Sequence, residues 1–181
     1  ALIVVANVKV APAVSDYTAK TVVKGGGEVV VLEGPPSSKP AVERLNGFKD
    51  GVKGNDKIQI VAEQAADWLP DKAQTAFAAM LQAHPDIKMV YASNDMMAAG
   101  ALLAAKGAGK TVKIIGTDGL PGPAGGIEAV AKGDWSATFT YPTGAKQAID
   151  MAKSILLDCA DSVPANVTVD TTAITADNAK K

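Results

Sequence analysis

Residues 88–119 read KMVYASNDMMAAGALLAAKGAGKTVKIIGTDG, and this stretch decides the fold. It opens with a short apolar run, residues 88–92. Ser93, Asn94 and Asp95 follow, and their side-chain oxygens can cap a helix. Residues 96–106 are strong helix formers and are followed by glycines that end a helix. A second apolar run, 112–116, precedes Asp118. The pattern predicts a strand, a helix and a second strand.

The helix between these two strands is too long for a hairpin connection. The strands are therefore expected to lie parallel, joined by a right-handed crossover. Asn94 and Asp118, which follow the two strands, then lie at the same edge of the sheet. Ligands of open parallel sheets bind outside the carboxyl ends of the strands. We therefore expect a ligand site at this edge.

The rest of the chain repeats the alternation of apolar runs and helical periods. Further strands are expected at residues 2–5, 28–33, 57–62, 136–140 and 166–169. Further helices are expected at residues 12–24, 40–53, 71–83, 127–132 and 143–157. Such an alternation predicts a three-layer α/β sandwich with a parallel, Rossmann-like sheet.

Composition excludes several classes of function. The chain has 181 residues, of which 48% are hydrophobic and 20% charged, so it can bury a core as one domain or two small lobes. The net charge is -1 and the only basic run is Lys180-Lys181, so nothing supports a nucleic-acid surface. No apolar run approaches the roughly 20 residues of a membrane span.

Catalytic and metal-binding patterns are weak. The chain has one histidine and one cysteine, so zinc sites, histidine-based triads and internal disulfides lack parts. The glycine-rich residues 24–28 follow a helix and lack the order of a phosphate-binding loop. Asp67, Asp95 and Asp118 fall near strand ends, which leaves a carboxylate metal site open. We expect no catalytic residue and no cofactor.

Three residues near strand ends each have two interpretations. Trp68 is either a lid over the core or an aromatic platform for the C–H face of a sugar. Asn94 is a helix cap, a ligand contact or both. Asp118 is either the turn residue of an Asp-Gly pair or a carboxylate that contacts ligand.

Taken as a set, several segments resemble the periplasmic sugar-binding proteins of the ribose-binding type, which share their core with the effector domains of the lactose-repressor family. The matching segments are residues 43–48 (ERLNGF), 65–68 (AADW), 83–86 (AHPD), 93–102 (SNDMMAAGAL) and 115–119 (IGTDG). The resemblance runs from about Asn7 to Pro142 and continues more loosely to the end. It implies a non-enzymatic protein whose two α/β lobes close over a sugar.

The resemblance also implies the site. The lobe similar to this chain supplies an aromatic residue, an asparagine and an aspartate, which by position are Trp68, Asn94 and Asp118. A polar side chain of the family falls at Tyr141, and Ser38 completes the expected set. The implied partners are a monosaccharide or polyol and the membrane permease of an ABC transporter. The implied location is the periplasm or, in a Gram-positive organism, the outside of the cell, where a lipid anchor would hold the protein to the membrane. The alternative is the effector-sensing domain of a transcription regulator.

Two departures from the family are expected to matter. A sugar-binding arginine of the family stands two residues before Arg44, where this chain has Val42. The missing arginine argues against ribose and suggests a different sugar, a polyol or a less polar ring. The first lobe is also absent. Residues 1–141 are expected to form the C-terminal-type lobe, and residues 142–181 the hinge crossings with a helix and tail that belong partly to the missing N-terminal lobe.

Overall fold

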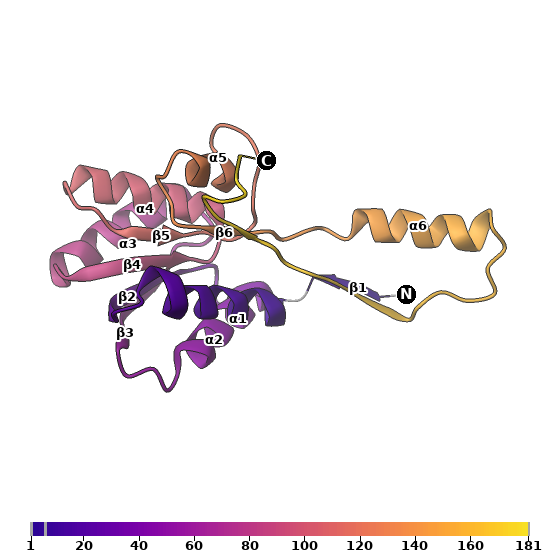
Figure 1. Cartoon of the computed structure of the whole chain (residues 1–181), viewed down its shortest axis with the longest axis horizontal. Helices are drawn as coiled ribbons and strands as arrows, with labels where there is room; N and C mark the ends of the chain where they lie inside the picture. Colours follow the sequence, from indigo (N-terminus) through magenta and orange to yellow (C-terminus); the bar gives the residue numbers. More distant parts are fainter. Residues whose placement is uncertain (1, 6, 181) are drawn as a thin grey trace.

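The computed structural model describes residues 2–5 and 7–180, and a four-stranded parallel sheet lies at its centre (Figure 1). The strand order is β3-β2-β4-β5. These strands are β2 (Gly27–Glu33), β3 (Ile58–Ala65), β4 (Ile87–Ala92) and β5 (Lys113–Ile115). The predicted parallel pairing of the two strands in residues 88–119 is confirmed, with Val90 opposite Ile114.

Helices cover both faces of this sheet. One face carries α1 (Asn7–Tyr17) and α2 (Lys39–Val52), and the other carries α3 (Pro70–Ala83) and α4 (Asp95–Gly107). Strand β2 shows the division, because Val29 and Val31 are buried in the cluster on the α1–α2 side. Val30 and Leu32 are buried in the cluster on the α3–α4 side. Each large apolar side chain buried in this way contributes roughly 1.5–3 kcal/mol to the stability of the fold. With helices on both faces of the sheet, the predicted three-layer sandwich is confirmed.

Two short strands extend the sheet beyond β5. Strand β6 (Thr138–Phe139) follows α5 (Gly126–Ala131) and lies beside the end of β5 through a parallel bridge between Ile115 and Ala137. Strand β8 (Ala173–Ile174) pairs antiparallel with β6. The sequence suggested only a polar end after residue 169, because a strand of two residues has no period to detect.

The remaining elements lie apart from this body (Figure 1). Helix α6 (Ala145–Leu156) has no buried residue, and Ile149 and Leu156 are 68% and 75% exposed. Strand β1 (Leu2–Val5) pairs parallel with β7 (Asn166–Val169), and this pair lies on the same side of the body as α6. The apolar stripe expected on the helix at residues 143–157 is therefore without a packing surface in the described part of the chain.

One helix boundary was predicted wrongly. The sequence predicted a helix at residues 12–24, but α1 begins at Asn7, contains Pro12 and continues as a π-helix (η1) over Thr18–Val22. Packing explains the difference, because α1 lies close against α2 where Gly47 and Gly51 have no side chain. A Cβ at either glycine would collide with a side chain of α1.

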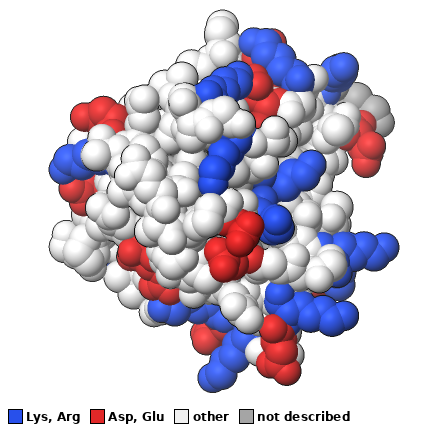
Figure 2. Space-filling view, turned by 90° about the vertical axis from the view of Figure 1, so that its left-hand side faces the viewer, with Lys and Arg blue, Asp and Glu red and all other residues white. Residues whose placement is uncertain are grey.

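The surface of the body is of mixed charge. Figure 2 shows acidic and basic side chains interspersed around a wide uncharged area, without a continuous basic surface among the described residues on the face shown. Among the residues that the structure describes, no helix is long and apolar enough to cross a membrane.

Candidate ligand-binding site

Asn94 lies at the carboxyl end of β4 and caps α4. Its backbone is extended, and its Oδ1 accepts a hydrogen bond of 2.8 Å from the N–H of Met97. Its Nδ2 donates to the carbonyl of Trp68 at 3.3 Å. The predicted cap is confirmed, and the same amide ties the β4–α4 turn to the loop that carries Trp68.

The loop after β3 sets the position of Trp68. Asp67 and Trp68 have φ of 53° and 66°, a left-handed conformation that L-residues rarely adopt. Gly34, at the end of β2, leaves room for the indole, because a Cβ there would collide with the ring. The loop conformation and the space above Gly34 thus bring Trp68 to the edge of the sheet shared with Asn94.

Asp118 follows β5 and is held by the strand next to it. Its N–H donates to the carbonyl of Phe139 at 2.9 Å, and its carbonyl accepts from the N–H of Tyr141 at 3.0 Å. Its φ of 127° lies outside the regions that a side chain normally tolerates. These bonds hold the backbone of Asp118 in a strained conformation and place Tyr141 beside it.

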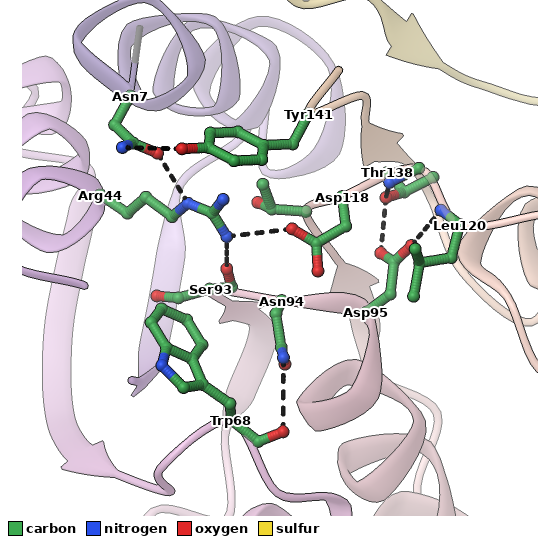
Figure 3. A network of polar contacts seen from close by, with 12 residues as sticks. Asn7, Arg44, Trp68, Ser93, Asn94, Asp95, Asp118, Leu120, Thr138 and Tyr141 are labelled. Atoms are coloured by element: carbon green, nitrogen blue, oxygen red, sulfur yellow. Dashed lines mark hydrogen bonds and ion pairs between the residues drawn. The ribbon is translucent and has the colours of Figure 1, made fainter. Parts of the chain in front are cut away.

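Arg44, from α2, is the charged centre of the site. The residue is 3% exposed and lies on the buried face of its helix, with Ala41 and Phe48. Its Nε donates to Oδ1 of Asn7 at 3.0 Å, and its Nη1 donates to the carbonyl of Ser93. The same Nη1 lies 3.2 Å from Oδ1 of Asp118 (Figure 3).

Two aromatic rings flank the guanidinium of Arg44. Its central carbon lies 4.5 Å from the ring centre of Tyr141 and 5.7 Å from that of Trp68 (Figure 3). Both distances fall within the range of cation–π attraction. The hydroxyl of Tyr141 also accepts a hydrogen bond of 3.5 Å from Nδ2 of Asn7. The arginine is thus fixed in place by hydrogen bonds and by aromatic contacts together.

The charge of Arg44 acts directly on Asp118. Burial raises the pKa of the Asp118 carboxyl, and the adjacent guanidinium lowers it again in part. The site therefore holds one cation and one carboxyl group in contact, partly withdrawn from water.

These side chains line a single cavity of about 240 Å³. Its lining consists of Ser38, Pro40, Arg44, Trp68, Asn94, Asp118 and Tyr141. All five side chains that the sequence analysis selected are therefore brought together, although Ser38 and Trp68 are 30 residues apart. Ser38 occupies the N-cap position of α2, and its hydroxyl makes no capping hydrogen bond within the described part of the chain.

Val42, which stands where the family has its sugar-binding arginine, does not line this cavity. Val42 is 41% exposed and lines a different hollow, on the surface formed by α1 and α2. Arg44, two residues later, occupies the cavity instead. Its spacing was a usable signal, because Ala41, Arg44 and Phe48 follow the i, i+3, i+7 period of a buried helix face. Asn7 was also missed, because it lies far from the other site residues in the sequence.

Other candidate chemistry is dispersed. The carboxylate of Asp67 pairs with Lys72 at 2.6 Å on the surface, away from Asp118. His84 is the C-cap residue of α3. No group of three or more His, Cys, Asp and Glu side chains that could hold a metal ion occurs within the described residues.

The fold is that of an α/β protein with a candidate ligand site at the carboxyl ends of its strands, and comparison with known proteins identifies its family. The periplasmic binding protein domain family matches residues 2–158, and the chain belongs to this family. The D-allose-binding periplasmic protein of Escherichia coli is 36% identical over 158 residues, which are 83% of this chain and 50% of that protein. The ribose operon repressor of Halalkalibacterium halodurans is 39% identical over 94 residues, 50% of this chain and 28% of that protein.

Solved structures agree with the fold. The fructose-binding periplasmic domain of a hybrid two-component system has a TM-score of 0.89 at 34% identity, covering 97% of this chain and 58% of that one. An ABC transporter solute-binding protein from Actinobacillus succinogenes with bound D-allose has a TM-score of 0.87 at 29% identity, covering 98% and 62%. The chain therefore spans only about half to three-fifths of the length of these relatives.

Proposed function

We propose that this chain is the C-terminal-type lobe of a solute-binding protein that takes up a monosaccharide or polyol for an ABC transporter. The observation that carries the proposal is the Arg44–Asp118 pair, placed between the rings of Trp68 and Tyr141 at one end of the sheet. Family membership and the sugar-binding names of its relatives support the same assignment.

The chemistry of the cavity suits a sugar. A pyranose or furanose ring has apolar C–H faces, which pack on aromatic rings such as Trp68, and hydroxyls that both donate and accept. The carboxylate of Asp118 accepts from a hydroxyl, and the guanidinium of Arg44 donates to one. Charge-assisted hydrogen bonds of this kind give the orientation that selects one sugar from another.

The cavity is small and open because, in our proposal, it is half of a cleft. An N-terminal lobe would supply the other half, and its closure would bury the sugar. The lobe described here would run from α1 to β6 and include β8, which pairs with β6. Strand β1, helix α6 and strand β7, which lie apart from it, would belong to the hinge crossings and the N-terminal lobe. The exposed stripe of α6 supports this division, because Ile149, Ile155 and Leu156 have no packing surface among the described residues. The closed form would dock on a membrane permease from the periplasm or, in a Gram-positive organism, from outside the cell.

A second function has its own support. The similarity to a ribose operon repressor favours an effector-sensing domain of a transcription regulator. Both functions use the same sugar site, and the flanking sequence distinguishes them. An upstream signal peptide supports the transport protein, and a helix-turn-helix supports the regulator.

We also propose that the protein binds its ligand without converting it. The titratable groups of the cavity are Asp118, Arg44 and Tyr141, and their contacts serve to hold one another. They do not form the nucleophile and base pair that covalent catalysis needs. Incubation of the ligand with stoichiometric protein should return it unchanged by mass spectrometry, and time-dependent product formation would overturn this proposal.

The test of sugar binding starts with the intact protein. A thermal-shift screen against pentoses, hexoses and polyols should give a higher Tm with one class of sugar, because a ligand that binds only the native state stabilises it. Calorimetry on Trp68→Ala and Asp118→Ala then locates the site. If both variants bind the identified sugar as tightly as the parent, the site lies elsewhere.

A further inference from the structure

Asp95 is a buried carboxylate directly behind the proposed sugar site. The residue is fully buried at the first position of α4. Its Oδ1 accepts a hydrogen bond of 2.6 Å from the hydroxyl of Thr138, and its Oδ2 accepts one of 2.8 Å from the N–H of Leu120 (Figure 3). The carboxylate therefore connects helix α4 to the segment after β5 and to strand β6.

These bonds hold the two residues that follow Asp118. Leu120 is two residues after Asp118, and the intervening Gly119 donates its N–H to the Thr138 hydroxyl at 3.2 Å. The same hydroxyl thus accepts from Gly119 and donates to Asp95. The strained backbone of Asp118, with φ of 127°, is followed directly by two amides that Asp95 holds, one directly and one through Thr138.

We propose that Asp95 is a positioning residue for Asp118, which fixes the segment from Asp118 to Leu120 so that the Asp118 carboxylate faces the sugar cavity. This proposal rests on the proposed sugar-binding function. It assigns no contact with the sugar to Asp95, because the residue does not line the cavity.

The charge environment of Asp95 makes this arrangement sensitive to pH. The pKa of the Asp95 carboxyl is raised to about 6, mainly by burial and in part by the nearby charge of Asp118, against the hydrogen bonds from Thr138 and Leu120, which lower it. Among the described residues no cation forms a salt bridge with Asp95, and Arg44 pairs with Asp118 instead. On α5, Glu128 pairs with Lys132. Acidification through about pH 6 therefore removes the charge that binds the segment.

Asp95→Asn is the informative substitution. One amide oxygen can still accept from the N–H of Leu120, and the amide N–H₂ can donate to the Thr138 hydroxyl, whose own proton then needs another acceptor. The variant therefore resembles the protonated form of Asp95 and keeps the shape of the side chain. Asp134→Asn is the matched control, because Asp134 is a carboxylate of the same lobe that pairs with Lys106 on the surface at 2.9 Å.

The test measures sugar affinity and amide exchange on the intact protein. At pH 7.5, Asp95→Asn should bind the identified sugar roughly tenfold more weakly than the parent, as expected for the loss of one charge-assisted hydrogen bond. Below about pH 5 the two proteins should bind alike, because the parent is then neutral at Asp95. A residue with a purely structural role would change the Tm without giving this convergence in sugar affinity.

Hydrogen exchange separates this proposal from the proposed function. The Leu120 amide should exchange faster in Asp95→Asn than in the parent and in Asp134→Asn, whether or not a sugar is identified. Unchanged exchange at Leu120 overturns the positioning role. Equal sugar affinity of the parent and Asp95→Asn at pH 7.5, or a gap that is the same at every pH, also overturns it. A parent protein that binds no sugar overturns only the proposed function, and the exchange data still decide the role of Asp95.

Discussion

Replacing Arg44 by leucine tests the central contact of the site. The guanidinium is almost fully buried, and its loss leaves Asp118 without a cation and leaves Oδ1 of Asn7 and the carbonyl of Ser93 without their donor. Removing one partner of a buried ion pair costs about 3–5 kcal/mol. The Asp118 side chain is 24% exposed, so water can solvate its carboxylate in part once the arginine is gone. We therefore expect Arg44→Leu to lower the free energy of unfolding by about 3 kcal/mol.

The expected loss is large enough to measure in two ways. For a chain of this length, each kcal/mol corresponds to roughly 2–4 °C, so Tm should fall by about 6–12 °C. Urea denaturation followed by tryptophan fluorescence should show a lower midpoint with an unchanged slope. Arg44→Lys should fall between parent and leucine variant, because a lysine keeps the charge but makes neither the forked hydrogen bonds nor the planar stacking.

A double-mutant cycle isolates the pair. Arg44→Leu combined with Asp118→Leu removes both charges, so the double variant should lose less stability than the sum of the single losses. If Arg44→Leu costs less than about 1 kcal/mol, the value of a solvent-exposed pair, then the guanidinium is not the buried centre that the structure describes. Strict additivity of the two substitutions would refute the coupling between them.

Four other predictions concern the site and its support. Trp68→Ala should weaken sugar binding by about tenfold or more in calorimetry, with the loss of one aromatic platform; an unchanged Kd contradicts this. The folded pKa of Asp95, about 6, lies above the ordinary 3.8, so its contribution to stability is present below the lower value and is lost as the pH rises to the higher one. Relative to the parent, Asp95→Asn should therefore gain stability as the pH rises from 4, by about 3 kcal/mol in total once the pH is well above 6, in urea titrations; a constant difference would contradict the raised pKa. Gly100→Ala should destabilise by about 1–3 kcal/mol, because its Cβ would collide with a backbone carbonyl of α3, whereas Gly107→Ala, with open space around it, should not. In the 181-residue chain alone, the amides of residues 145–156 should exchange rapidly, and strong protection in a monomer would show that α6 docks on this lobe.

Several features of the protein follow from local sequence. The order of strands and helices depends on hydrophobic periods and caps that act over a few residues, and Asn94 caps α4 as its position predicts. The parallel pairing of β4 and β5 follows from the length of the helix between them. Trp68, Asn94 and Asp118 follow strands, so their arrival at one sheet edge could be predicted from the order of elements.

Tertiary structure decided what the site contains at its centre. Arg44 reaches Asp118 across 74 residues of sequence, and Asn7 orients Arg44 from a third segment, α1. No local period encodes these contacts, because they depend on how α2 approaches both α1 and the segment after β5. The same limit hid β8, whose two residues form a strand only because β6 offers them a partner. Local propensity acts between neighbours in the chain, and it determined the helices and strands. A buried charge is stable only beside a partner, and only the packed fold supplies that partner.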